Sequence, residues 1–93
     1  MKYAVVLSAK AMKMLDRLDR KIEHRIQARF DELAANPLDP RISSQLETAA
    51  GRNYSRGGDW RIIYEIREAD QTVFVVTVQH RICVYKEMHK LRR

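Results

Sequence analysis

The sequence predicts an α+β domain in which a hairpin of two helices packs on one face of an antiparallel sheet. Apolar residues recur at helical spacing from residue 9 to 36 and then alternate from residue 60 to 79. A short β-forming segment at residues 2–8 precedes the helices. The expected order is therefore β, α, α, β, β, β within one domain spanning residues 1–93. We expect residues 84–91 to form a short C-terminal helix or tail.

Composition excludes several classes of protein. The 93 residues are 45% hydrophobic with only three Gly and two Pro, which suits a packed globule rather than a disordered tail. No stretch approaches the roughly 18 apolar residues that a membrane span requires, so we expect a soluble, cytoplasmic protein with no membrane partner. A lone Cys83 forms no internal disulfide and no metal site. A core this small leaves little room for a deep pocket, and no cofactor is expected.

The helical segments have identifiable beginnings and ends. Ser8 is placed to cap a first helix over residues 9–18, and Asp19 to cap a second. The second helix carries an apolar stripe and stops at Asn36-Pro37, because the residue before a proline disfavours helical geometry. Its stripe consists of Ile22, Ile26, Phe30 and Leu33. Residues 37–51 are polar and irregular, which indicates a long connection.

Alternation in the strands assigns side chains to the two faces of the sheet. Residues 52–56 form an early strand, and Gly57-Gly58 marks the turn that follows. Trp60, Ile62, Tyr64 and Ile66 would face the helices, as would Phe74, Val76, Val78 and His80 of the next strand. Arg61 and Arg81 would then converge on the uncovered face, beside Gln79. They either keep an exposed sheet soluble or bind an anion.

The charge favours an anionic partner without identifying it. The formal net charge is +6, and residues 51–93 carry seven arginines against two lysines. Arginine offers a planar fork of donors that binds phosphate in a bidentate manner. A nucleic acid partner and an ordinary basic surface both remain open on this observation alone.

Two blocks of residues resemble a known family. The run from Arg56 through Gly57-Gly58-Asp59-Trp60-Arg61 to Tyr64 and Ile66, followed by His80-Arg81 and Tyr85, resembles the RelE/ParE toxin superfamily of toxin–antitoxin modules. Members typically show an Arg-x-Gly-Asp-Tyr-Arg-x-x-Tyr block and a later His-Arg-x-x-x-Tyr block. The resemblance extends over nearly the whole chain, including the helix before Asp19.

The resemblance implies a RelE-like toxin of a type II toxin–antitoxin system. On the RelE branch such a toxin is an endoribonuclease, an mRNA interferase that enters the A site of the 70S ribosome, cleaves the bound mRNA and inhibits translation under stress. Its partners would be the ribosome, mRNA and a cognate antitoxin. The catalytic residues would correspond to Arg61, Arg81 and Tyr85. RNA-binding positions would be Arg52, Tyr54, Arg56, Lys86 and Lys90, with Tyr54 standing where the family usually has a Lys or Arg.

Metal-independent RNA cleavage uses the ribose 2′-OH as nucleophile. The enzyme must remove that proton, stabilise charge on the phosphorus and protonate the leaving oxygen. Arginine suits the second task only, because its pKa above about 12 keeps it protonated. Tyr85 is the better candidate base, since neighbouring arginines favour the phenolate. His89 and His80 are further acid or base candidates, although the parity of His80 favours a structural role.

Two other functions remain open at this point. A ParE-type inhibitor of DNA gyrase shares the fold, but that branch usually lacks the His-Arg-x-x-x-Tyr ending and has a longer helical hairpin. A catalytically degenerate relative would bind only RNA or the antitoxin, and Tyr54 keeps this option open.

Overall fold

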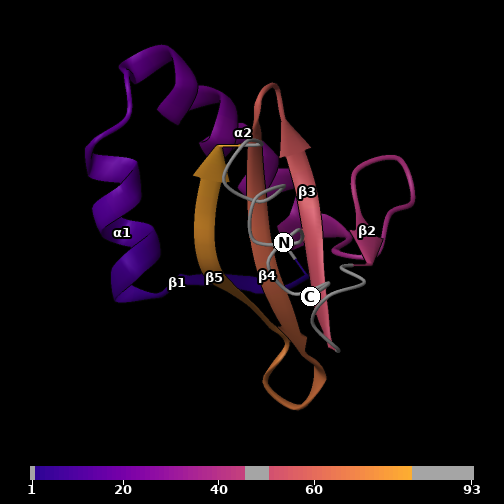
Figure 1. Ribbon diagram of the computed structural model, residues 1–93. Helices are drawn as coiled ribbons and strands as arrows, with labels where there is room; N and C mark the ends of the chain where they lie inside the picture. Colours follow the sequence, from indigo (N-terminus) through magenta and orange to yellow (C-terminus); the bar gives the residue numbers. More distant parts are fainter. Residues whose placement is uncertain (1, 46–50, 81–93) are drawn as a thin grey trace, which may run out of the picture.

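The structure is a computed structural model that describes residues 2–45 and 51–80. Five strands form one sheet in the order β1-β5-β4-β3-β2, with two helices against it (Figure 1). The predicted α+β fold class is confirmed. The elements are β1 (Ala4–Leu7), α1 (Ala9–Asp16), α2 (Arg20–Ala35), β2 (Ser44–Gln45), β3 (Arg52–Gly57), β4 (Trp60–Arg67), a 3-10 turn (Glu68–Asp70) and β5 (Thr72–His80). The expected C-terminal helix lies outside the described residues.

The sheet is mixed because its first strand pairs in parallel, whereas all the other neighbouring strands pair antiparallel. Strand β1 pairs parallel with β5, whereas β5, β4, β3 and β2 pair antiparallel in turn. The two helices provide the crossover that a parallel connection requires. Strand β2 lies within the segment that the sequence predicted to be a long connection. With only two residues, it is too short for the alternation of apolar and polar side chains that reveals a strand.

Both helices begin and end near their predicted positions. Ser8 accepts a hydrogen bond at Oγ from the Ala11 N–H (3.0 Å) and so caps α1, which ends at Asp16, two residues before the expected end. Helix α2 starts after Asp19, although the Asp19 side chain makes no capping hydrogen bond. It ends at Ala35, immediately before Asn36-Pro37, as the sequence predicts.

The core forms where α1 and α2 meet the sheet. The apolar stripe of α2 is confirmed, since Ile26, Phe30 and Leu33 are buried and Ile22 is half-buried against them. Helix α1 adds two residues, and the strands add the rest. The buried cluster is Ala11, Leu15, Ile26, Phe30, Leu33, Ile62, Tyr64, Val73, Val75 and Val78. Burial of these side chains is the main stabilising term for a domain of this size.

A β-bulge in β5 changes which of its residues face the helices. Ile63 pairs with Thr77 and Tyr64 pairs with Val75, so Val76 is an extra residue with no partner in β4. Val73 and Val75 are fully buried beside Ile66 and Tyr64, whereas Phe74 lies on the opposite face, across from Glu65. The prediction that Phe74 and Val76 share the helix-covered face is therefore wrong.

Beyond the bulge the predicted assignment holds. Val78 pairs with Ile62 and His80 with Trp60, on the side of the helices. Strict alternation from Val73 would have placed Thr77 and Gln79 in the core. The bulge instead places those two polar side chains on the face opposite the helices, where both are also buried.

Ser8 connects this bulge to the start of α1. Its hydroxyl donates to the carbonyl of Val76, and its backbone N–H donates to the carbonyl of Val75 (3.0 Å). The same oxygen accepts the Ala11 N–H described above. One side chain thus satisfies the carbonyl of the bulged residue and caps a helix.

We expect Ser8→Ala to lower the free energy of unfolding by about 1 to 3 kcal/mol, because both the cap and the Val76 carbonyl lose their partner. Ser8→Thr keeps the hydroxyl and is the matched control. Urea unfolding followed by circular dichroism measures both variants. Equal stability of Ser8→Ala and the wild type would contradict this role of Ser8.

Candidate RNA-binding face

Three neighbouring strands present basic and polar side chains on the face opposite the helices. In the register, Arg52 lies across from Glu65, Tyr54 from Ile63, Arg56 from Arg61, and Arg61 from Gln79. Residues directly opposite one another share a face of the sheet. We call Arg52, Tyr54, Arg56, Arg61 and Gln79 the arginine face. Figure 1 looks onto it, with α2 behind the strands.

Arg56 and Arg61 form a like-charged pair directly across β3 and β4. Arg61 is half-buried, and its Nη1 lies within hydrogen-bond distance of the carbonyls of Gly58 (3.4 Å) and Trp60 (3.3 Å) at the hairpin turn. Gly58 has φ +65°, a conformation that favours glycine. The turn therefore helps to hold the Arg61 guanidinium at the end of the sheet, next to the exposed Arg56.

At the other end of the arginine face, two arginines share one carboxylate. Arg52 Nε lies 3.1 Å from Glu65 Oε2, and Arg67 Nη2 lies 3.7 Å from Glu65 Oε1. The Arg67 guanidinium also stands 4.3 Å from the centre of the Phe74 ring. Glu65 therefore offsets part of the positive charge of Arg52 and Arg67 at this end.

A shallow pocket adjoins the arginine face at the edge of β3. Tyr54 and Arg56 form one side, and the segment from Pro40 to Ser44 forms the other. Arg29 of α2 also lines it and donates through Nη1 to Ser55 Oγ (3.0 Å). The sequence reasoning missed Arg29 and Arg41. Arg41 is a basic residue in the irregular connection after α2, and Arg29 is one of several charged residues of α2 itself.

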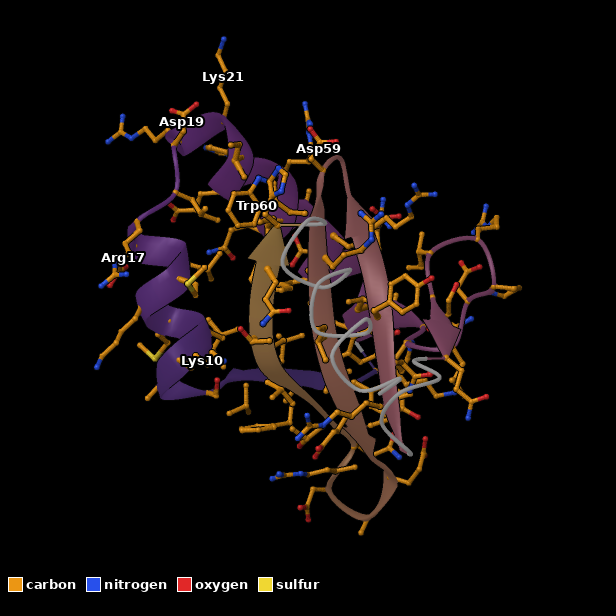
Figure 2. The ribbon with its side chains drawn as sticks, viewed as in Figure 1. Lys10, Arg17, Asp19, Lys21, Asp59 and Trp60 are labelled. Atoms are coloured by element: carbon orange, nitrogen blue, oxygen red, sulfur yellow. The ribbon has the colours of Figure 1, made fainter. Side chains whose placement is uncertain are left out.

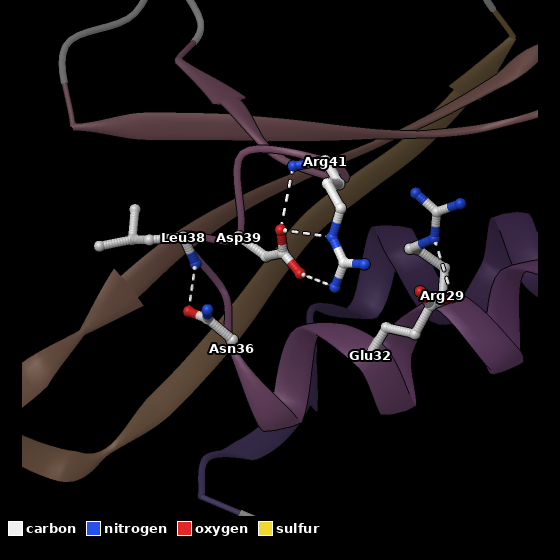
Figure 3. Close-up of polar contacts among 6 residues, drawn as sticks. All are labelled: Arg29, Glu32, Asn36, Leu38, Asp39 and Arg41. Carbon is white, nitrogen blue, oxygen red and sulfur yellow. Dashed lines mark hydrogen bonds and ion pairs between the residues drawn. The ribbon is translucent and has the colours of Figure 1, made fainter.

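Arg41 is held in place by Asp39. Arg41 Nη2 donates to Asp39 Oδ2 (2.9 Å), and Nε donates to Oδ1 (3.2 Å) (Figure 3). Hydrogen bonds from the Arg41 side chain and backbone lower the pKa of the Asp39 carboxyl. Arg29 Nε lies 3.3 Å from Glu32 Oε1 in the same view. Two of the guanidiniums at the pocket, those of Arg41 and Arg29, are therefore oriented by carboxylates.

Tyr64 fixes the segment that carries Arg41. The Tyr64 side chain is fully buried, and its hydroxyl donates to the carbonyl of Pro37 (2.7 Å). A second hydrogen bond joins it to the Ser43 hydroxyl (2.6 Å). Burial raises the pKa of Tyr64, and the Ser43 contact partly opposes that rise. The central strand is in this way tied to residues on both sides of Arg41.

His80 lies on the helix-covered side of the sheet. Its ring packs edge-on against Trp60, with centroids 5.4 Å apart and planes at 88°. Figure 2 shows Trp60 at the end of its strand, beside the helices, with Asp59 at the hairpin tip. This position matches the structural role that the parity of His80 predicts, and it separates His80 from the arginine face.

The structure brings together the predicted positions Arg52, Tyr54, Arg56 and Arg61. Arg81, Tyr85, Lys86, His89 and Lys90 lie outside the described residues, so their assignments stay predictions. Within residues 2–45 and 51–80, no three His, Cys, Asp or Glu side chains gather as a metal site would need. The helices in those ranges include none that is long and apolar enough to cross a membrane.

Comparison with known proteins identifies the family. Residues 5–82 match the family model described as "ParE toxin of type II toxin-antitoxin system, parDE". The chain belongs to the RelE/ParE toxin superfamily. It is accordingly a toxin of the type II toxin–antitoxin class, and the resemblance seen in the sequence is confirmed. No curated protein sequence matches the chain.

Solved structures of RelE-type toxins share the fold. The chain is similar to the toxin–antitoxin complex RelBE2 from Mycobacterium tuberculosis, with TM-score 0.77 and 29% identity over 87% of this chain and 100% of that one. The archaeal RelE–RelB complex from Pyrococcus horikoshii gives 0.75 and 24%, over 87% and 97%. The isolated E. coli RelE toxin gives 0.73 and 20%, over 95% and 96%. The last two are similar in fold alone.

We expect Tyr64→Phe to destabilise the toxin by about 1 to 3 kcal/mol at pH 7, because the buried Pro37 carbonyl and Ser43 hydroxyl lose a partner. The raised pKa of Tyr64 means that its protonated form is favoured in the folded state. Its contribution is complete below the unfolded pKa near 10 and is lost as pH rises through the higher folded value.

The difference in stability between wild type and Tyr64→Phe should therefore shrink above pH 10. Urea unfolding of both proteins at pH 7 and pH 10.5 measures it. A difference that stays constant or grows with pH would contradict the buried, protonated tyrosine.

Proposed function

We propose that this toxin is a ribosome-dependent endoribonuclease that cleaves mRNA in the A site without a metal. The observation that carries the proposal is the Arg56–Arg61 pair. Like charges directly opposite each other in a sheet destabilise it. An anion bound between them would relieve that repulsion, and a phosphodiester fits two guanidinium forks.

The chemistry assigned to the arginine face follows from the properties of arginine. Attack of the ribose 2′-OH on the adjacent phosphorus breaks the bond to the 5′-oxygen and leaves a 2′,3′-cyclic phosphate. Arg61 would stabilise the additional negative charge on the phosphorane oxygens. We propose that Arg81 contributes a second guanidinium, and that Tyr85 removes the 2′-OH proton. His89 is the candidate to protonate the leaving oxygen.

Partner specificity is proposed on the same basis. The toxin similar at 29% identity was solved in a complex with its antitoxin, which supports a cognate antitoxin for this chain. An acidic antitoxin segment would compete with RNA for the arginine face, because both need positive charge. Inhibition of the nuclease would then be a direct blockade of that face.

Inhibition of DNA gyrase is the second candidate, favoured by the family model, which is described as a ParE toxin. That function needs a protein-binding surface rather than a transition-state site. Replacing a single arginine should therefore abolish most of the activity of a nuclease, but not that of a gyrase inhibitor.

We predict cuts within the translated codons of a reporter mRNA when the toxin is added to translating ribosomes. Mapping the 3′ ends of the fragments measures them. Arg61→Ala and Arg81→Ala should each lower the cleavage rate by about 10² to 10³-fold, which is typical of losing one transition-state contact. Arg17→Ala removes the same charge from the exposed end of α1, away from β3, and should cleave normally (Figure 2).

Three outcomes separate the candidates. Cuts confined to translated codons support the nuclease. Intact mRNA together with altered DNA supercoiling would overturn it in favour of gyrase inhibition. Intact mRNA and normal supercoiling, with antitoxin binding retained, would indicate a degenerate relative.

Removing one arginine of the Arg56–Arg61 pair should have different effects on stability and on activity. Arg56→Gln should leave the free energy of unfolding unchanged or raise it by up to about 1 kcal/mol, because it removes a like-charge repulsion. The same variant should cleave mRNA more slowly. Urea unfolding and the 3′-end assay, run on one preparation, check both. A clear loss of stability would show that the two arginines do not repel in the free protein.

A further inference from the structure

The pocket at the edge of β3 continues the arginine face beyond the proposed site of cleavage. Arg56 belongs to both, since it opposes Arg61 across the sheet and also lines the pocket. Tyr54 lies two residues along the same strand face and lines the pocket as well. A strand of RNA bound at Arg61 would therefore reach this pocket with its neighbouring nucleotide.

The pocket has donors suited to a phosphate. Arg41 is oriented by its two hydrogen bonds to Asp39 while its side chain remains 86% exposed, so outward-facing N–H groups are available to a ligand. Arg56 is exposed, and its side chain makes no ion pair or hydrogen bond with the residues that the structure describes. Arg29 adds a third guanidinium, held by Ser55 and Glu32.

The remaining lining suits a nucleoside. The half-buried Tyr54 side chain lines the pocket and offers an aromatic ring, on which any base can stack. Exposed Ser44 contributes a hydroxyl that can donate to or accept from a ribose 2′-OH. Ser43 is already engaged with Tyr64, so Ser44 is the hydroxyl available.

We propose that this pocket binds the nucleotide next to the scissile one in single-stranded RNA, with its phosphate between Arg41 and Arg56 and its base on Tyr54. The inference rests on the proposed RNA-cleaving function. It also accounts for Tyr54 at a position where the resemblance leads us to expect a basic residue: stacking replaces one ionic contact. An acidic peptide would use the arginines but gain nothing comparable from the ring, so RNA is the favoured ligand.

Binding of a fluorescein-labelled, mixed-sequence single-stranded RNA, measured by anisotropy over a range of salt concentrations, tests the pocket. Arg41→Gln should weaken binding and lower the slope of log K against log salt by about 0.7, the value for one phosphate contact. Asp39→Asn/Arg41→Gln keeps the net charge of the wild type and should show the same loss. Tyr54→Leu should weaken binding about 5- to 140-fold, as expected for a lost base stack, without changing the slope.

Arg17→Gln is the matched control, since it removes one exposed arginine from the end of α1. An equal effect of Arg17→Gln and Arg41→Gln would show nonspecific charge attraction and overturn the pocket. Wild-type affinity for RNA in the charge-preserving variant Asp39→Asn/Arg41→Gln would also overturn the pocket. So would a competition experiment in which polyglutamate displaces the RNA equally well from wild type and from Tyr54→Leu.

The 3′-end assay keeps this inference distinct from the proposed function. Normal cleavage of translated mRNA by wild type, together with unchanged RNA binding by Arg41→Gln and Tyr54→Leu, would overturn the pocket and leave the nuclease standing. Absence of both cleavage and RNA binding in the wild type would overturn both.

Discussion

At Val76, strand β5 carries one residue more than the β4 segment opposite it, and the Ser8 hydroxyl binds the carbonyl of that residue. Without the extra residue, the valines that pack under α1 and α2 would share a face with Thr77 and Gln79. The bulge lets one strand bury Val73 and Val75 at one end and Val78 at the other. Gln79 therefore lies beside Arg61, on the face opposite the helices.

The bulge and the Tyr64 anchor act at the same point of the sheet. Tyr64 is the first residue of β4 after the register shift, and its hydroxyl reaches the carbonyl of Pro37 beyond α2. Movement of the strand at this point would disturb the hydrogen bonds of both Pro37 and Ser43. These bonds hold the segment containing Arg41 beside β3, so the core also positions the edge of the proposed RNA-binding face. Positive charges can be crowded there because packing elsewhere supplies the stability.

The sequence predicts the helices well and the sheet less completely. Ile26, Phe30 and Leu33 recur at helical spacing and lie on one side of a helix, so the stripe predicts both α2 and the face that it buries. Residues 73–76 are all apolar, so either the odd-numbered or the even-numbered ones could face the helices. Alternation alone therefore could not locate the bulge. Alternation in β4 placed Arg61 on its face, whereas Arg52 and Arg56 of β3 were predicted from the family resemblance. The pocket was missed because Arg29, Arg41 and Tyr54 come from three separate segments that only the tertiary fold brings together.

Photo-crosslinking on translating ribosomes tests most directly whether the arginine face contacts mRNA. A photo-reactive amino acid would replace Tyr54 on that face, and in a second protein would replace Met12, which is exposed on α1. The account predicts an mRNA crosslink from position 54 and none from position 12. A crosslink to mRNA from position 12 alone, or to gyrase from position 54, would contradict it.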